Sequence, residues 1–308
     1  MKFSHIPVLL EECLEGLDIK PGGTYIDGTA GGGGHSEGIA KRLSANGSLL
    51  SIDRDPDAVS AASERLSAYT AKVVRGNYSD IAQIARENGI EYADGILLDL
   101  GVSSHQLDIS ERGFSYHAEN APLDMRMSKE GKTAGALINE YSYQELRRVL
   151  YEYGEEKFAP KIAAEIIKRR EIKPIETTGE LAEIIKNSVP AKFKRAHNPC
   201  KKTFQALRIA VNSELEHLSS CLDNAFELLR PGGRLCVITF HSLEDRMVKH
   251  RFAGFCQGCI CPPKCPVCIC GNTPKAKRIS KKPIIPAESE ITRNNRARSA
   301  KLRIIEKI

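Results

Sequence analysis

The chain has 308 residues, of which 41% are hydrophobic and 27% are charged, a composition typical of a soluble globular protein with room for two structural parts. No apolar run approaches the ~20 residues that a membrane helix needs, and Glu11 and Glu12 come too early for a signal peptide. We therefore expect a cytoplasmic protein without a membrane partner.

The net charge of +6 is unevenly distributed along the chain. Residues 271–308 carry a net charge of +8, so the first 270 residues sum to −2. A second basic stretch, residues 191–213, contains no acidic residue and holds Lys192, Lys194, Arg195, Lys201, Lys202 and Arg208. Two such stretches favour a polyanionic partner, most simply nucleic acid. For either stretch alone, a solvated basic surface is an equally good interpretation.

The first predicted elements lead to a glycine-rich loop. A helix ending at Leu17 precedes a short strand at 24–26, which reaches Asp27 and then five glycines within residues 28–34. A helical pattern begins near Ser36. Glycine suits this place because the backbone turns sharply there and a ligand can approach it closely, next to the free N–H groups of a helix end. The loop resembles the D-x-G-x-G-x-G loop of S-adenosylmethionine-dependent methyltransferases, with Thr29 in place of the first glycine.

Further strands are predicted at 48–52, 72–74 and 95–98, each followed by a helix or a break in the pattern. Their nearly continuous apolar character indicates a parallel sheet that is covered on both faces. From Val102 to about Pro199 the pattern is helical, at 142–152, 156–170 and 178–188, which predicts an inserted all-helical domain.

After this insertion we expect one long helix from Thr203 to Leu229, a turn at 230–234, a strand at 235–240, a helix at 243–252 and a closing strand at 300–305. The predicted domains are therefore 1–106 with 200–308 for the sheet, 107–199 for the helical insertion, and a cysteine-rich loop at 256–270.

Polar groups at the predicted strand ends indicate a nucleoside cofactor. Ligands of open α/β sheets bind at the carboxyl ends of the strands. Asp53 follows Gly33 by 20 residues, the separation at which a carboxylate commonly accepts hydrogen bonds from ribose hydroxyls. Tyr78 can stack on an adenine, and Asp99 ends the strand at 95–98. Each residue alone could equally be structural, and only their joint occurrence favours the cofactor.

Several longer sequence segments resemble those of the family of ribosomal RNA small subunit methyltransferase H. These segments are His5 together with residues 7–10, then Asp27–Ser36, 52–55, 95–104, 112–115, 122–127, 153–156, 203–209 and 240–246. The similarity resumes at residues 295–303. The turn at 228–235 is similar to the one before strand five in class I methyltransferases. The resemblance implies a Rossmann-like class I fold and methylation of the exocyclic N4 of a cytidine in the decoding region of 16S rRNA.

The resemblance also implies which residues contact S-adenosylmethionine: Gly33, Gly34, His35, Asp53, Tyr78, Asp99 and Gln106. A sulfonium methyl group is already activated, so the enzyme mainly has to align donor and acceptor. The Asp/Asn-Pro-Pro-aromatic motif of many amino methyltransferases is absent after the strand at 95–98. Asp99 occupies its place and is our candidate catalytic residue, for orienting the amine or the cofactor.

The target base has to leave its stack to reach such a pocket. His241, just past the strand at 235–240, is expected either to face that base or to be a structural strand-end residue. Candidate phosphate contacts on the 16S rRNA or the small ribosomal subunit are Lys201, Lys202, Arg208, Arg293, Arg296 and Arg298. The sequence leaves open whether the protein is a monomer or a dimer.

Six of the ten cysteines lie between Cys256 and Cys270, a clustering that argues for metal or redox chemistry. Two Cys-x2-Cys pairs predict a structural zinc site with the ligands Cys256, Cys259, Cys265 and Cys268, and with Cys261 and Cys270 as substitutes. The spacing between the pairs is shorter than in ordinary zinc ribbons. A disulfide, an iron–sulfur site and a metal-free loop therefore remain alternatives.

Two other classes of function compete with a methyltransferase. A nucleotide-dependent oxidoreductase would bind a nicotinamide cofactor and not S-adenosylmethionine. A non-catalytic RNA-binding module on the same fold would bind RNA and leave it unmethylated. The sequence has no resemblance to a nicotinamide-enzyme catalytic site, which favours methyl transfer over hydride transfer.

Overall fold

A computed structural model describes residues 7–194, 198–262 and 267–308. His5, Arg195 and Cys265, which entered the sequence argument, lie outside these residues. Chain contacts divide the protein into a sheet unit, made of the residues up to Gly101 together with Leu215–Ile308, and a helical unit, Val102–Glu214. None of the helices in the described ranges has the length and apolar character that crossing a bilayer requires.

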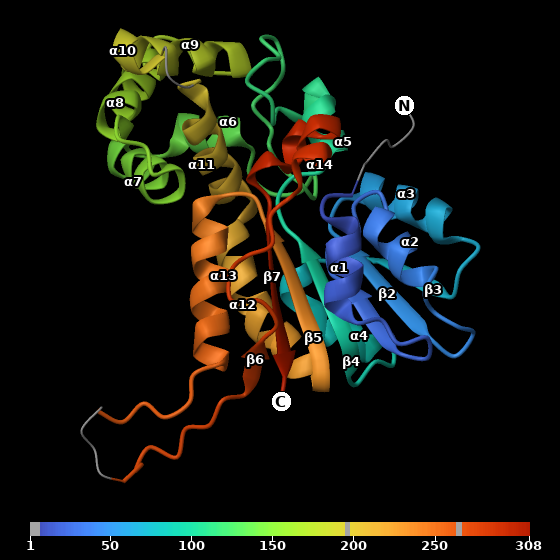
Figure 1. The fold of residues 1–308 in the computed structure, drawn as a ribbon. Coiled ribbons are helices and arrows are strands. Elements are labelled where there is room, and N and C mark those ends of the chain that lie inside the picture. Colours follow the sequence, from blue (N-terminus) through green and yellow to red (C-terminus); the bar gives the residue numbers. More distant parts are fainter. Residues whose placement is uncertain (1–6, 195–197, 263–266) are drawn as a thin grey trace. The chain divides into compact units, whose positions relative to one another are not determined.

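The sheet unit is built on seven strands in the order β3-β2-β1-β4-β5-β7-β6 (Figure 1). The strands are β1 (Thr24–Asp27), β2 (Ser48–Asp53), β3 (Ala71–Arg75), β4 (Ala93–Asp99), β5 (Leu229–Thr239), β6 (Ala276–Arg278) and β7 (Lys301–Lys307). The first five run parallel, whereas β7 pairs antiparallel with both β5 and β6. The predicted α/β sheet is therefore confirmed, and β6 is a strand that sequence analysis missed.

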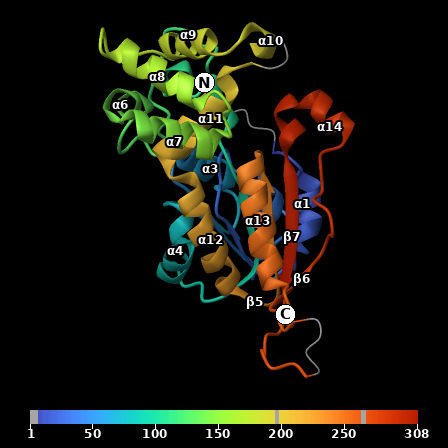
Figure 2. The ribbon, with the colours of Figure 1, turned by 90° about the vertical axis from the view of Figure 1, so that its left-hand side faces the viewer.

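Helices cover both faces of this sheet because side chains alternate along each strand. On one face, Tyr25, Leu49 and Leu97 pack with α1 (Leu10–Leu17) and α2 (Gly34–Ala40). On the other face, Ile26, Leu50 and Leu98 pack with α4 (Ile81–Glu87), α12 (Glu214–Leu228) and α13 (Ser242–Phe255). Figure 2 shows α12 and α13 in front of the sheet. The remaining elements of the unit are α3 (Pro56–Leu66), η1 (Tyr78–Asp80), α14 (Glu288–Arg293) and η3 (Asn295–Ser299).

The helical unit has a hydrophobic core of its own, drawn mainly from α6 (Ala134–Glu140), α7 (Tyr143–Gly154), α8 (Ala159–Arg170), α9 (Thr178–Ser188) and α11 (Cys200–Asn212). It also contains α5 (Ser104–Asp108), η2 (Ser110–Arg112) and α10 (Ala191–Lys194). Ser142 and Thr177 cap α7 and α9 by accepting hydrogen bonds from the backbone N–H three residues on. The predicted helices at 142–152, 156–170 and 178–188 match α7, α8 and α9 closely.

The single long helix predicted for 203–229 is wrong. The structure has two helices, α11 and α12, separated by Ser213, whose φ of +48° lies in the left-handed region and ends α11. The buried side chains of α11 join the core of the helical unit, and those of α12 join the core of the sheet unit. The boundary between the two units therefore falls at Glu214/Leu215 and not at residue 200, and the first boundary falls at Gly101/Val102.

The turn predicted at 230–234 is a bulge inside β5. Leu229 already pairs with Ala93, and Arg234 pairs with Gly95, so three extra residues are looped out of β5 between these pairs. Gly232 has a φ of +80°, a conformation that glycine adopts without strain.

We predict that Gly154→Ala destabilises the helical unit. A Cβ at this position would lie 2.8 Å from the carbonyl oxygen of Lys202 and 3.2 Å from the Cβ of Ala206, so α7 and α11 would have to move apart. Such overpacking costs about 1–3 kcal/mol of unfolding free energy. Urea denaturation followed by circular dichroism measures the loss.

Gly254→Ala in α13 is the matched control, because a Cβ there meets nothing within 4 Å. It should leave stability unchanged or raise it by up to about 1 kcal/mol, the difference in helix propensity between alanine and glycine. Equal midpoints for the two variants would contradict the close packing of α7 on α11.

Candidate active site

At the carboxyl ends of the central strands, β1 ends before its two neighbours, and we refer to the region beyond the end of β1 as the crevice. Asp27, the last residue of β1, pairs with Ser51 of β2 and with Leu97 of β4. Asp53 and Asp99 each end a strand two residues further on, which is about 6.6 Å along the strands. The strand order reverses between β1 and β4, and ligands of open α/β sheets bind at this kind of position.

The glycine loop follows the end of β1 and is held there by hydrogen bonds to Asp27. This buried carboxylate accepts hydrogen bonds from the Ser36 hydroxyl at 2.6 Å and from the Thr29 N–H at 3.1 Å. Gly33, with a φ of +76°, precedes α2, and a Cβ on it would lie 3.2 Å from the Cα of Ala62. The loop therefore needs glycine at this position both for its backbone conformation and for its close approach to α3.

Asp53 joins the glycine loop to the start of α3. One carboxylate oxygen accepts a hydrogen bond from the Gly31 N–H and the other from the Asp55 N–H, both at 2.8 Å. Burial raises the pKa of Asp53 to about 6, although these two N–H groups act in the opposite direction. A carboxylate has about four lone-pair sites, so Asp53 keeps acceptor capacity for hydroxyl groups of a ligand.

Asp99 lies on the other side of the loop, and one of its oxygens has no partner. Its backbone N–H donates to the Thr29 hydroxyl at 2.6 Å, and its Oδ2 lies 3.5 Å from Nδ1 of His35. Oδ1 is buried and has no hydrogen-bond partner in the described residues. A buried carboxylate oxygen without a partner is costly, so this atom indicates a donor supplied by a ligand.

The protonation states of His35 and Asp99 follow from their burial. Burial lowers the pKa of His35 to about 4, so its ring is neutral. Its Nε2–H donates a hydrogen bond to the Val8 carbonyl, 3.0 Å away. Nδ1 is then an acceptor that faces Asp99. Burial, together with the charges of Asp27 and Glu244, raises the pKa of Asp99 well above its ordinary value. A ligand that brings positive charge or N–H donors would favour the ionised carboxylate.

The structure brings together most of the predicted cofactor residues. Gly33, Gly34, His35, Asp53 and Asp99 surround the end of β1, and Tyr78 follows β3, with its Cβ 3.5 Å from the position that a Cβ on Gly28 would take. Gln106 belongs to the helical unit instead, where its side chain accepts a hydrogen bond from the Ser103 N–H and completes the cap of α5. Its contact with a cofactor stays a prediction.

Thr29 is the residue of the site that sequence analysis did not single out for a role. It interrupts the glycine pattern, and its hydroxyl holds the backbone of Asp99. The signal in the sequence was this deviation itself, a side chain able to hydrogen-bond in a loop that otherwise consists of glycine and alanine.

His241 acts as a helix cap in this structure. Its Nδ1 accepts a hydrogen bond from the Glu244 N–H at 3.4 Å, and its Nε2 lies 3.0 Å from Oε1 of Glu244. Glu244 in turn accepts from the backbone N–H of Phe240 and of His241. Of the two roles that the sequence left open, these contacts favour the structural one at the start of α13.

The basic C-terminal segment lies next to the crevice. Arg293, Arg296 and Arg298, on α14 and η3, are exposed. The segment is held in place by Glu290, whose carboxylate accepts a hydrogen bond from the Leu9 N–H at 2.8 Å. The preceding residue, Val8, contacts His35, so the anchor of this basic segment is only two residues from the site. These arginines therefore remain candidate phosphate contacts.

The basic residues of α11 differ in what they can bind. Lys201 and Lys202 are exposed, and the Lys202 ammonium donates to the Glu155 carbonyl at 2.8 Å. Arg208 is 15% exposed and makes two hydrogen bonds of 2.8 Å to the carboxylate of Glu214. Arg208 therefore forms an ion pair within the helical unit, and its contact with phosphate stays a prediction.

The predicted set of zinc ligands needs correction. Cys256 directly follows α13 and packs against the core of the sheet unit, and Cys265 lies outside the described residues. Among the described cysteines, those whose sulfur atoms come together are Cys259, Cys261, Cys268 and Cys270. The two residues that sequence analysis offered as substitutes, Cys261 and Cys270, thus belong to this group, and Cys256 does not.

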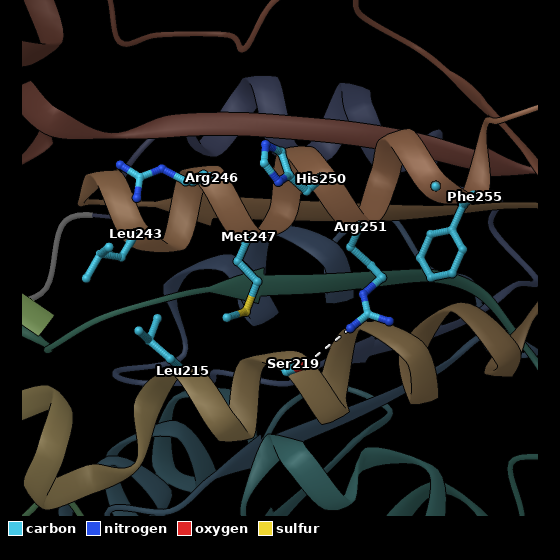
Figure 3. A pocket seen from close by; sticks show the side chains of 9 residues that line it. Leu215, Ser219, Leu243, Arg246, Met247, His250, Arg251 and Phe255 are labelled. Carbon is cyan, nitrogen blue, oxygen red and sulfur yellow. Dashed lines mark hydrogen bonds between the residues drawn. The ribbon is translucent and has the colours of Figure 1, made fainter. Parts of the chain in front are cut away.

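An open groove of about 660 Å³ lies between α12 and α13 (Figure 3). Leu215, Leu243 and Met247 give it an apolar lining, and Arg251 donates to the Ser219 hydroxyl at 3.2 Å. No residue of the glycine loop lines this groove. A cofactor that contacts Gly33 and Asp53 would bind at the strand ends and not here.

The sheet order with an antiparallel β7, and a glycine loop facing an acidic residue at the end of β2, together define a class I S-adenosylmethionine-dependent methyltransferase fold. Comparison with known proteins gives the particular family. The model of the MraW methylase family matches residues 2–308, so the chain belongs to this family.

Curated relatives match over the whole chain. The chain is 52% identical to ribosomal RNA small subunit methyltransferase H 2 of Agathobacter rectalis, over 100% of this chain and 99% of the relative. It is 51% identical to ribosomal RNA small subunit methyltransferase H of Symbiobacterium thermophilum, over 100% and 98%. It is 52% identical to the protein of the same name from Heliobacterium modesticaldum, over the full length of both.

Proposed function

We propose that this protein transfers a methyl group from S-adenosylmethionine to the exocyclic N4 of a cytidine in the decoding region of 16S rRNA. The names of the relatives support small-subunit rRNA as the substrate. The choice of N4 rests on the family resemblance and on one structural observation, which is the buried, unpartnered Oδ1 of Asp99. An amino group would supply the donor that this atom lacks.

The crevice fits the cofactor on the evidence of its own residues. Asp53 has spare acceptor capacity for ribose hydroxyls, and the loop up to Gly33 brings bare backbone to the end of β1. Tyr78, partly buried beside β3, offers a ring for the base. When bound, S-adenosylmethionine supplies an activated sulfonium methyl group.

Asp99 would perform the step that cytosine makes difficult. The lone pair of N4 is delocalised into the ring, so the amine becomes nucleophilic only as it pyramidalises. An ionised Asp99 can accept an N–H bond through Oδ1, hold the nitrogen in that geometry and take up the proton that methylation releases. Thr29 fixes the backbone of Asp99 through its hydroxyl, and the neutral ring of His35 lies beside the other carboxylate oxygen, Oδ2, at 3.5 Å.

The experiment that tests this function measures transfer of labelled methyl groups from S-adenosylmethionine to purified small ribosomal subunits and to naked 16S rRNA. Large subunits serve as the matched control acceptor. We expect label in small-subunit rRNA and none in large-subunit rRNA. Label in large-subunit rRNA, or bound cofactor without transfer to any acceptor, would contradict the proposal and favour another substrate or a binding module.

Cofactor affinity should depend on pH through Asp53. Because burial raises the pKa of Asp53 to about 6, the ligand-free carboxyl group is largely protonated at pH 5 and largely ionised at pH 7. Ribose hydroxyls bind the ionised form better, so affinity rises with pH, and at pH 5 we expect it to be about tenfold weaker. Isothermal titration of S-adenosylhomocysteine at the two pH values measures this.

The comparison with Asp53→Asn isolates the contribution of this one group, because Asp99 also titrates. The variant should bind weakly at pH 7 and lose the tenfold change. A pH dependence equal to that of the unmodified protein would show that another group is responsible.

Arg293 and Arg298 should contribute to RNA affinity through charge. Both are exposed beside the crevice, and each phosphate contact adds roughly one to the slope of log affinity against log salt concentration. We expect the double variant Arg293→Gln, Arg298→Gln to bind small subunits more weakly and to reduce that slope by about 1 to 2. Filter binding across a salt series provides the measurement.

A double variant with the same loss of charge, Lys72→Gln and Arg86→Gln, provides the control. These two exposed residues lie on β3 and α4, away from α14. If both double variants change the slope equally, the effect comes from net charge and not from a contact at the C-terminal segment.

A further inference from the structure

The loop between α13 and β6 contains a group of cysteines whose sulfur atoms lie close together. The sulfur atoms of four cysteines all lie within 4.8 Å of one another, and we refer to Cys259, Cys261, Cys268 and Cys270 as the four-cysteine group. The Sγ atom of Cys268 lies 3.4 Å from that of Cys259 and 3.6 Å from that of Cys270, and Cys270 lies 3.7 Å from Cys259. These separations are far longer than a disulfide bond of about 2.05 Å.

The separations match the edge of a tetrahedron around one metal ion. Zinc binds thiolate sulfur at about 2.3 Å, and four sulfurs arranged tetrahedrally at that distance are about 3.8 Å apart. Larger iron–sulfur clusters place several irons between the cysteine sulfurs and would hold the sulfurs further apart. The geometry therefore favours a single ion over a cluster.

Backbone N–H groups also point at the sulfurs. The N–H of Ile260 lies 3.4 Å from Sγ of Cys270, and the N–H of Ile269 lies 3.3 Å from Sγ of Cys261. The N–H of Asn272 lies 3.5 Å from Sγ of Cys270. Hydrogen bonds to a sulfur atom favour its thiolate form, which is the form that binds metal.

The described residues of this loop, 257–262 and 267–275, form no hydrophobic core that could order them in another way. Ile260, Val267 and Ile269, its large aliphatic residues, are 59%, 70% and 82% exposed. Both ribbon views show the segment after α13 extending away from the sheet (Figures 1 and 2). A small segment that buries so little apolar surface usually needs a disulfide or a metal to hold one conformation.

The loop lies near the amino ends of the parallel strands, whereas the crevice lies at their carboxyl ends. α13 begins just after the carboxyl end of β5 and runs back toward the amino ends of the parallel strands, where the loop starts. The loop leads into β6, which pairs with the last residues of β7, whereas Lys301 at the start of β7 pairs with Thr239 at the end of β5. An ion in this loop is therefore structural, since it lies far from Asp99.

We propose that the four-cysteine group binds one Zn²⁺ ion as four thiolates and thereby holds residues 259–261 and 268–270 of the loop together. Binding releases the thiol protons to solvent and involves no change of oxidation state. This inference is independent of the methyl-transfer activity, because the loop lies at the end of the sheet opposite to the crevice.

The test begins with the full chain, purified without a metal-affinity step and dialysed against metal-free buffer. Elemental analysis should find about one zinc per chain and no stoichiometric iron. A mercurial reagent that titrates thiolates should release this zinc in step with the modification of four thiols, which requires no variant. Zinc below about a tenth of an equivalent after incubation with zinc salt would overturn the proposal, as would an iron centre or a disulfide in its place.

Variants then identify the ligands. Cys259→Ser and Cys270→Ser should each lose most of the zinc, whereas Cys256→Ser, a change of the same kind just outside the group, should keep it. Far-ultraviolet circular dichroism shows whether each variant remains folded, because the helices and strands of the sheet unit lie outside the loop. Zinc retained in both Cys259→Ser and Cys270→Ser, or lost only in Cys256→Ser, would contradict the assignment.

Discussion

The substitution Asp99→Asn is expected to reduce the rate of methyl transfer by about 10²- to 10⁴-fold, the range over which a positioned acid or base contributes. Asparagine has nearly the same shape, so it can replace the aspartate side chain at the end of β4 beside Thr29 and His35. It cannot, however, take up the proton that leaves N4. The effect should appear in kcat more than in the KM for the cofactor, measured with labelled S-adenosylmethionine and small subunits.

Asp94→Asn is the matched control for this variant because Asp94 lies on the same strand at its other end. Its carboxylate accepts a hydrogen bond from the Thr24 N–H and pairs with Arg230, so the change should affect stability and leave the rate near that of the unmodified enzyme. A near-normal rate for Asp99→Asn, or equal losses in both variants, would remove Asp99 from the chemistry.

The second large effect is expected for Asp53→Ala, which should weaken cofactor binding by about 10- to 100-fold. Hydrogen bonds to a charged group contribute roughly 1.5–3 kcal/mol each. The variant loses the acceptor for ribose and also releases the N–H groups of Gly31 and Asp55, which loosens the glycine loop. Calorimetric titration with S-adenosylhomocysteine measures the loss directly.

Asp55→Ala separates these two contributions. Asp55 caps α3 by accepting a hydrogen bond from the Asp57 N–H, and its removal should cost about 1 kcal/mol of stability with cofactor affinity within a few-fold of normal. If Asp53→Ala binds the cofactor as tightly as Asp55→Ala does, ribose recognition does not depend on Asp53.

The parallel sheet and the acidic ends of its strands could be predicted from the sequence because the signals are local. Apolar runs bounded by glycine, proline or aspartate gave β1, β2 and β4 within a residue or two, and each of these runs ends on an aspartate. Parallel strands align their carboxyl ends, so Asp27, Asp53 and Asp99 had to lie together at that end of the sheet. The unpartnered oxygen of Asp99 depends on packing and could not be read from the sequence.

Other features depend on contacts between distant residues and escaped prediction. The helical periodicity continues through Ser213, so the break between α11 and α12 is visible only in the backbone conformation of that residue. Arg208 belongs to a stretch without acids, yet the turn at Ser213 brings Glu214 back to pair with it. The grouping of Cys261 and Cys270 with Cys259 and Cys268 likewise depends on how the loop folds.

Digestion of the methylated rRNA to nucleosides, followed by chromatography against standards, tests the central proposal most directly. The proposal predicts that the labelled product of the unmodified enzyme is N4-methylcytidine and that this product is lost with Asp99→Asn. Label on C5 of cytosine or on a ribose hydroxyl would contradict it, because neither acceptor places an N–H donor at the buried oxygen of Asp99.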